Sequence, residues 1–188
     1  MKKRVFIALN LPEAAKEALT KLISQTKKIN SQPVIRYVKA KGIHLTLHFL
    51  GYLDENQINQ VKDILKKLAK IYQQTELISG KIDAFPNLNR PRVIFLTGEE
   101  RGGENLITLQ KNLGQELEKI DIEVDHRPWH PHLTIARIKG PTQFKTEDLK
   151  VPQLFIPIKS IELMESKLSP YGAEYKILTS FTLKESRS

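Results

Sequence analysis

The chain has 188 residues, of which 40% are hydrophobic, so it can bury a core in one domain or in two lobes that share a site. It contains no cysteine, which excludes disulfides, thiol nucleophiles, thiolate metal sites and iron–sulfur clusters. Its 30 Lys and Arg outnumber its 21 Asp and Glu and give a net charge of +9, which favours a polyanionic partner about as much as a generally basic protein.

The first half of the chain predicts three strands and two amphipathic helices. Residues 4–9 form a β-rich run, too short for a secretory signal, and Pro12 follows it where a helix can begin. Apolar residues then keep helical spacing to about residue 30 and again over residues 55–72. Strands are expected at residues 35–38 and, from alternation, at residues 44–50. Since no apolar stretch approaches the ~20 residues of a membrane span, we expect a cytoplasmic protein without a membrane partner.

The second half predicts further strands around one more helix. Its helix should cover residues 104–120, and the segment over residues 140–157 is rich in loops. The expected strands are residues 76–85, 92–98, 133–138, 161–168 and 174–183, with a turn-rich segment at 86–91 and a hairpin turn at 169–172.

A helix followed by a strand that carries His-Leu-Thr occurs twice. The two motifs begin at His44 and His132, so they lie 88 positions apart (132 minus 44). An internal duplication of one such unit predicts an α+β fold with two sheet-bearing lobes and a cleft between them. We find no interdomain linker, and we therefore expect residues 1–188 to form a single bilobal domain.

Each motif presents one imidazole and one hydroxyl on the same side of its strand. Residues i and i+2 of a strand share a face, which pairs His44 with Thr46 and His132 with Thr134. Two facing histidines suit in-line displacement at phosphorus, because a neutral ring can take a proton from the nucleophile while a protonated ring gives one to the leaving oxygen. The threonine hydroxyls can hold the non-bridging oxygens.

Several neighbouring residues admit more than one interpretation. Arg137 is a candidate to offset phosphate charge, but strict alternation turns it away from His132, so a twist or bulge must redirect it. His48 alternates onto the His44 face, and we place it on the rim of the site. Phe49 alternates to the opposite face, which predicts a core aromatic. Arg36 can border the site or be a solvated surface charge.

The segment before the second motif also raises the question of a metal. Asp125, His126, His130 and His132 are close in sequence, but Pro128 and Pro131 interrupt them and no second ligand group has a recognisable spacing. We therefore expect no metal and no other cofactor. Trp129 should pack beside the second motif.

The sequence as a whole resembles the 2H phosphoesterase superfamily, and in particular its branch of RNA 2′,3′-cyclic phosphodiesterases, also named 2′-5′ RNA ligases. The resemblance spans nearly the whole chain. It rests on residues 4–9 (RVFIAL), 43–51 (IHLTLHFLG), 85–86 (FP), 90–96 (RPRVIFL), 130–137 (HPHLTIAR) and 163–166 (LMES), and on Gly172 and Tyr175. Tyr37 stands where many relatives carry Trp, and the aromatic ring is kept.

The resemblance implies two antiparallel sheets with outer helices that frame a central catalytic cleft. It implies hydrolysis of a terminal 2′,3′-cyclic phosphate to a 2′-phosphate without a metal, with His44 as proton donor and His132 as proton acceptor. Thr46, Thr134 and Arg137 match phosphate-contacting positions. Phe49 matches a position where a ring can stack on the terminal base, and Arg36 stands where it can meet RNA phosphates.

The expected partner is RNA with a 2′,3′-cyclic phosphate end, and tRNA halves would be one such RNA; no obligate protein partner is expected. Three alternatives stay open. The same site can run in reverse as a 2′-5′ RNA ligase, it can act on a small cyclic nucleotide phosphate, or the chain can be a non-catalytic RNA-binding module.

Overall fold

The computed structural model describes residues 1–169 and 172–185 and has the α+β architecture expected from the sequence. Its helices are α1 (Glu13–Ile29), α2 (Glu55–Ala69) and α3 (Asn105–Glu118), and a short 3₁₀ turn, η1, spans Ala40–Gly42. Its strands are β1 (Lys3–Asn10), β2 (Ile35–Tyr37), β3 (His44–Leu53), β4 (Thr75–Phe85), β5 (Val93–Glu100), β6 (His132–Ile138), β7 (Phe155–Ile158), β8 (Ser160–Ser169) and β9 (Gly172–Thr182).

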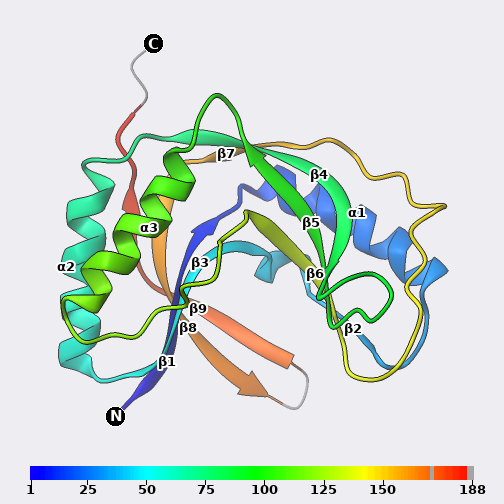
Figure 1. The fold of residues 1–188 in the computed structure, drawn as a ribbon, viewed down its shortest axis with the longest axis horizontal. Helices are drawn as coiled ribbons and strands as arrows, with labels where there is room; N and C mark the ends of the chain where they lie inside the picture. The colour runs from blue at the N-terminus through cyan, green and yellow to red at the C-terminus, as the bar shows by residue number, and fades with distance from the viewer. Residues whose placement is uncertain (170–171, 186–188) are drawn as a thin grey trace.

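The strands form two antiparallel sheets, one around β1 and the other around β5 (Figure 1). The first sheet has the order β3-β1-β8-β9, and the second has the order β2-β6-β5-β4-β7. The first sheet therefore joins strands from both ends of the chain, whereas β2, from the N-terminal half, belongs to the second sheet. The two sheets share the chain instead of dividing it into halves.

A strand–helix–strand unit occurs twice and places the two motifs in equivalent positions. In the first unit α1 lies between β1 and β3, with β2 and η1 inserted after the helix, and in the second α3 lies between β5 and β6. β1 pairs with β3 and β5 pairs with β6, both antiparallel. This is the arrangement expected of the duplication, and it puts each His-Leu-Thr on the second strand of its unit.

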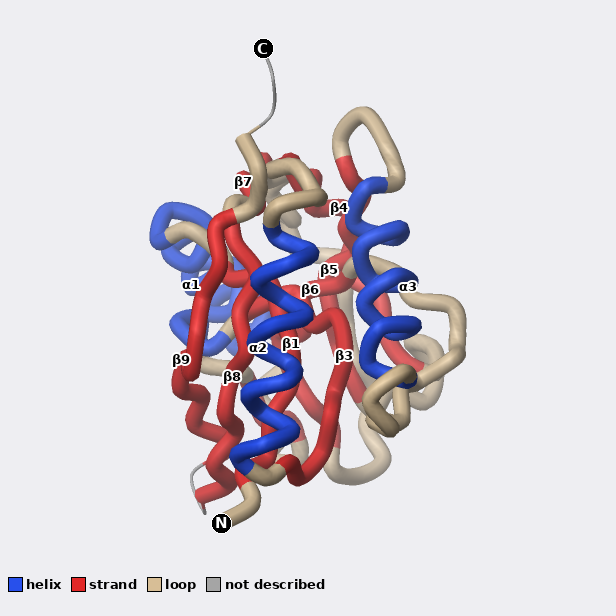
Figure 2. Tube along the Cα trace, turned by 90° about the vertical axis from the view of Figure 1, so that its left-hand side faces the viewer, coloured by secondary structure: helices blue, strands red, loops and turns tan. Residues whose placement is uncertain are grey.

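The helices cover the outer sides of the sheets. α2 packs against β8 and β9 and also against α3, and Figure 2 shows it lying across the first sheet. It begins with a capping box, in which the Asp54 side chain accepts from the Gln57 backbone N–H at 2.9 Å. α1 lies beside the second sheet, where the Tyr37 hydroxyl of β2 donates to the carbonyls of Thr26 (3.3 Å) and Asn30 (2.9 Å).

The two faces of the first sheet have different surroundings. Val5, Ile7 and Leu9 of β1 join the large core that the helices cover. Phe6 and Ala8, which alternate with them, belong to a separate small cluster with Met164 and Tyr175. We call the face that carries His44 and Thr46, and the equivalent face of the second sheet that carries His132 and Thr134, the motif face.

The structure differs from the sequence expectations at a few places. An additional short strand, β7, begins within the segment expected to be loop, and η1 was not predicted. β7 is an edge strand that pairs only with β4. Its four residues are all apolar and include Pro157, so its sequence shows no alternation of polar and apolar residues that would predict a strand. The expected turn at 169–172 includes two residues outside the described part of the chain. Within the described residues, no helix has the length and apolarity needed to cross a membrane.

Candidate active site

The first histidine is oriented by the backbone just before its strand. His44 is the first residue of β3, and its Nδ1 lies 2.8 Å from the carbonyl oxygen of Gly42 in η1. A carbonyl oxygen only accepts, so Nδ1 carries the hydrogen and Nε2 is left for chemistry. The ring packs against Phe6 and Tyr175, whose ring centroids lie 4.8 Å and 5.0 Å from that of His44.

The second histidine repeats this arrangement on the other sheet. His132 is the first residue of β6, and its Nδ1 lies 2.8 Å from the carbonyl oxygen of His130. Both histidines thus bond the carbonyl two residues upstream, and within the described part of the chain neither Nε2 has a hydrogen-bond partner. Phe85 and Phe95 stack on each other with centroids 4.2 Å apart, and each contacts the His132 ring at 5.3 Å.

A β-bulge after the first motif inverts the alternation of β3. Ala8 pairs with Thr46 and Ile7 with His48, so Leu47 is the extra residue. Leu47 and His48 are both buried in consequence. Phe49, which strict alternation sends to the core, instead lies on the motif face, where its side chain is 62% exposed and its ring centroid is 5.9 Å from that of Phe6.

An equivalent bulge follows the second motif. Phe95 pairs with Thr134 and Ile94 with Ala136, so Ile135 is the extra residue, and Ile135 and Ala136 are both buried. The bulge returns Arg137 to the motif face, as the sequence analysis required. Counting along the two strands, Phe49 and Arg137 occupy the same place relative to their histidines.

Arg36 lies next to Arg137. The two arginines are direct partners in the β2–β6 pairing, so their side chains leave the same face of the second sheet, and both are exposed. Neither makes an ion pair within the described residues. Two adjacent cations without carboxylate partners among the described residues have the charge needed to attract a polyanion.

His48 is not on the rim of the site, and that prediction was wrong. Its side chain is 4% exposed and lies on the core side of β3, where Nε2 is 2.9 Å from the carbonyl oxygen of Gln110 in α3. The bulge at Leu47 is the reason, because it moves His48 across the sheet and brings Phe49 to the face where His48 was expected.

The two sheets meet at the motifs. β3 and β6 approach each other, and the indole Nε1 of Trp129 donates to the carbonyl oxygen of Thr46 at 2.9 Å. Trp129 precedes the second motif in the chain, yet its hydrogen bond is to the first. The residue therefore joins the two strands that carry the histidines.

Burial and nearby positive charge lower the pKa values of both histidines. The pKa of His44 is lowered to about 4, first of all by burial; the hydrogen bond to Gly42 acts in the opposite direction, and the positive charges of Arg137, Lys16 and His132 also contribute to the lowering. Burial also lowers the pKa of His132, with further contributions from Arg137 and His130. Arg137 acts on both rings, so it lies within electrostatic reach of both.

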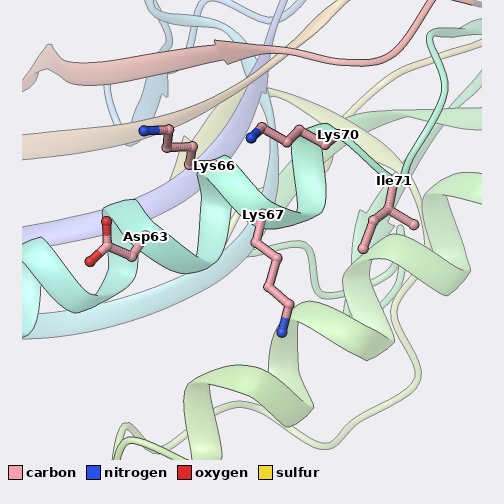
Figure 3. A pocket seen from close by; sticks show the side chains of 5 residues that line it. All are labelled: Asp63, Lys66, Lys67, Lys70 and Ile71. Atoms are coloured by element: carbon pink, nitrogen blue, oxygen red, sulfur yellow. The ribbon is translucent and has the colours of Figure 1, made fainter.

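The predicted site residues do not line either of two hollows on the surface of the protein. One hollow of about 360 Å³ lies on α2 and is lined by Asp63, Lys66, Lys67, Lys70 and Ile71 (Figure 3). Another of about 250 Å³ is lined by Gln25, Lys28, Ile29, Asp148 and Lys150. Neither includes a motif residue, and lysines on an outer helix surface do not by themselves build a site.

The possible metal ligands before the second motif do not lie close enough together to form a metal site. His126 lies beside the carboxylate of Glu118, with Nε2 3.3 Å from Oε1, and Asp125 pairs with Arg127. Within the described residues, no three His, Cys, Asp or Glu side chains are grouped so that they could hold a metal ion.

The sequence alone did not reveal which side chains surround the His44 ring. Phe6 and Tyr175 carry part of the family resemblance, but nothing in their spacing shows that their rings contact His44. Lys16, whose charge acts on His44 from α1, carried no signal in the sequence.

The chain is similar in sequence to known phosphodiesterases. The family profile described as LigT like Phosphoesterase matches residues 9–95 and 98–175. An RNA 2′,3′-cyclic phosphodiesterase of Methanothermobacter thermautotrophicus is 27% identical over 97% of this chain and 100% of its own length. One of Bacillus subtilis with the same name is 32% identical over 70% of this chain and 69% of its own length.

Solved structures show the same fold. A protein of Thermus thermophilus superposes with a TM-score of 0.80 at 27% identity and covers 98% of this chain and 100% of its own. Escherichia coli LigT, solved with 3′-AMP, gives a TM-score of 0.76 at 22% identity, with 97% of this chain and 99% of its own covered.

Proposed function

The chain belongs to the LigT-like phosphoesterases of the 2H superfamily, and from this premise we propose that it is an RNA 2′,3′-cyclic phosphodiesterase. It would open a terminal 2′,3′-cyclic phosphate to a 2′-phosphate. Relatives that carry this name match 97% and 70% of the chain, with identities of 27% and 32%. The observation that supports the proposal most is the paired arrangement of His44 and His132, each with Nδ1 on a carbonyl and Nε2 free.

In the proposed reaction one histidine receives a proton while the other gives one. The oxygen of water attacks phosphorus as the bond from phosphorus to O3′ breaks. Nε2 of His132 accepts the water proton, and Nε2 of His44 donates its proton to the departing O3′. The product carries a 3′-hydroxyl and a 2′-phosphate. The two histidines then exchange their protons with solvent before the next turnover.

The remaining motif residues would bind the phosphate. The hydroxyls of Thr46 and Thr134 can donate to the non-bridging oxygens, and Arg137 can offset the charge that develops on them. Phe49, exposed on the same face, can stack on the terminal base, and Arg36 can meet an RNA phosphate.

The donor histidine has to take up its proton from solvent when the substrate binds. Because the pKa of His44 is lowered to about 4, its ring is neutral near pH 7 in the free protein. An anionic phosphate bound beside His44 and Arg137 favours the charged imidazolium and raises that pKa. The substrate thus creates the acid that acts on it.

The central experiment uses an RNA oligonucleotide that ends in a 2′,3′-cyclic phosphate. We expect a 2′-phosphate product in the presence of excess EDTA, identified by end-group analysis. His44→Ala and His132→Ala should each lower kcat by about 10²–10⁴-fold, the range for loss of a general acid or base, while RNA binding persists. A 3′-phosphate product, loss of activity with EDTA, or near-normal turnover by either variant would contradict the mechanism.

The cellular setting and the reverse reaction are finer parts of the proposal. We propose that the substrates are cytoplasmic RNAs with cyclic ends, such as tRNA halves. A 5′-hydroxyl in place of water would give 2′-5′ ligation at the same site. Adding an RNA with a 5′-hydroxyl to the same assay measures this directly, as a joined product.

A further inference from the structure

The motif face of the first sheet continues beyond Phe49 toward the far ends of β1 and β3. Arg4 and Tyr52 are direct partners there, just as Phe6 and Phe49 are one step closer to the histidine. Arg4 alternates with Phe6 along β1, so Arg4 and Tyr52 lie on the same face as Phe49. We call Arg4 and Tyr52 the outer pair.

The outer pair combines an exposed aromatic ring with a half-buried cation. Tyr52 is 63% exposed, as open as Phe49 at 62%, so neither ring contributes to the core. The Arg4 guanidinium reaches across to the Ser166 hydroxyl, with Nη1 3.5 Å from Oγ, and makes no ion pair within the described residues. Glu165, the acidic residue of β8 closest in register, pairs with Val5 and so lies on the opposite face.

The spacing between the two rings suits successive nucleotides. Their partners on β1, Phe6 and Arg4, are two residues apart, which is about 7 Å along a strand. In an extended strand of RNA, successive bases can be separated by about this distance. The terminal base can therefore stack on Phe49 while the base on its 5′ side stacks on Tyr52. The linking phosphodiester then falls beside Arg4. Single-stranded nucleic acid is bound in this way by alternating rings and cations.

We propose that the outer pair is a subsite for the nucleotide on the 5′ side of the cyclic end. Tyr52 stacks on its base and Arg4 contacts its phosphodiester. This rests on the proposed function, and it deepens that function by naming the substrate class. The enzyme acts on the end of an RNA chain of at least two nucleotides and uses a mononucleotide cyclic phosphate less well.

The test compares two substrates with the same terminal base, a nucleoside 2′,3′-cyclic phosphate and a dinucleotide that ends in it. We expect the wild type to prefer the dinucleotide in kcat/KM. Tyr52→Ala should reduce dinucleotide kcat/KM by about 5- to 100-fold, the usual effect of losing one base stack, and leave mononucleotide kcat/KM within about twofold. Tyr52→Phe keeps the ring and should keep the preference.

A matched control is available on the other sheet. Phe155 in β7 is also an exposed aromatic residue, at 54%, but it lies beside Arg101 and away from the motifs. Phe155→Ala should change the rate with neither substrate. An equal loss in Phe155→Ala and Tyr52→Ala would show a general surface effect and overturn the proposal.

Arg4 is tested through salt dependence. The Arg4→Gln variant should lower the slope of log kcat/KM against log salt for the dinucleotide by about 0.7, the value for one phosphate contact on a single strand. Lys66→Gln, at an exposed position of α2 that lines the hollow in Figure 3, should leave that slope unchanged. Arg4→Lys keeps the positive charge and should keep most of the slope. A retained slope in Arg4→Lys would show that the change in Arg4→Gln comes from the lost contact with the phosphate and not from misfolding.

The outcomes separate the two proposals. If the wild type hydrolyses both substrates but Tyr52→Ala keeps the full dinucleotide preference, the subsite is wrong and the phosphodiesterase stands. If the wild type opens neither cyclic phosphate, the proposed function itself fails.

Discussion

His44 and His132 share a local geometry that decides which of their nitrogens can act. Each ring is tied at Nδ1 to the carbonyl two residues upstream, at 2.8 Å in both cases. The hydrogen bond fixes the tautomer and the ring orientation before any ligand binds, so the entropy of orienting the imidazole is already lost. Placing the histidine at the first position of a strand makes this bond possible, because the chain upstream is free to turn back toward the ring.

The lowered pKa of His44 predicts a loss of stability in acid. The pKa of His44 is about 4 when folded, against an ordinary ~6.5 in an unfolded chain. Between these values the unfolded state binds the extra proton, so the free energy of unfolding decreases as the pH falls from about 6.5 toward 4. His44→Asn cannot titrate, and its stability should fall less over that range.

Urea denaturation at pH 7, 5.5 and 4.5 measures this difference. His48 and His132, whose pKa values are also lowered by burial, remain in both proteins, so the comparison isolates His44. If the free energy of unfolding decreases equally with pH in the wild type and in His44→Asn, the His44 ring is already solvated in the folded protein.

At the scale of single elements, the two bulges determine which residues reach the site. The repeated His-x-Thr pairs were visible in the sequence because i and i+2 alternation holds up to the threonine. Beyond it the extra residue inverts the pattern, and nothing in Leu47 or Ile135 marks it as extra. For this reason His48 was assigned to the wrong face, and for Phe49 alternation favoured the core while the family resemblance favoured a place beside the substrate. Arg137 was the exception. Strict alternation would turn this arginine toward the core, where its charge would be costly to bury, so a bulge could be expected before it.

The same limit applies to the contacts between elements. The long helices followed from apolar spacing, but β7 needed its partner β4 to be recognised, and the rings of Phe6 and Tyr175 needed the sheet to bring them to His44. Local patterns predicted the elements, whereas register and long-range packing decided the surroundings of the site.

The packing of α3 on β3 gives a prediction at this scale. A Cβ added at Gly114 would lie 3.2 Å from the buried His48 ring, which is held by its bond to Gln110. Gly→Ala inside a helix usually stabilises by about 0.5–1 kcal/mol, but overpacking costs about 1–3 kcal/mol. We expect Gly114→Ala to destabilise the protein by about 1 kcal/mol.

A double-mutant cycle with His48→Ala tests the cause. Ala136 is the residue at the equivalent place in the second motif, so alanine fits this bulge. In the His48→Ala background Gly114→Ala should no longer destabilise, because the ring is absent. Additive effects, measured as free energies of unfolding, would place the origin elsewhere than the contact between His48 and Gly114.

At the scale of the whole molecule, the chain crosses between the sheets more than once. It leaves the first sheet after β1, adds β2 to the second, returns for β3, and comes back at the end as β8 and β9. Each sheet is therefore incomplete until distant segments arrive. This interlocking predicts that the two lobes fold together and cannot be separated by cutting the chain at one place.

Trp129, the single tryptophan, lies where this prediction can be measured. Its Nε1 bonds the Thr46 carbonyl on β3, so its fluorescence reports contact between the strands that carry the two motifs. If both lobes form one cooperative unit, urea transitions followed by tryptophan fluorescence and by far-ultraviolet circular dichroism should coincide. A fluorescence change at lower urea, with most of the dichroism retained, would mean that the lobes separate before they unfold. Trp129→Phe removes this bond and should lower the midpoint of the dichroism transition without splitting it, because the crossing strands still hold the lobes together.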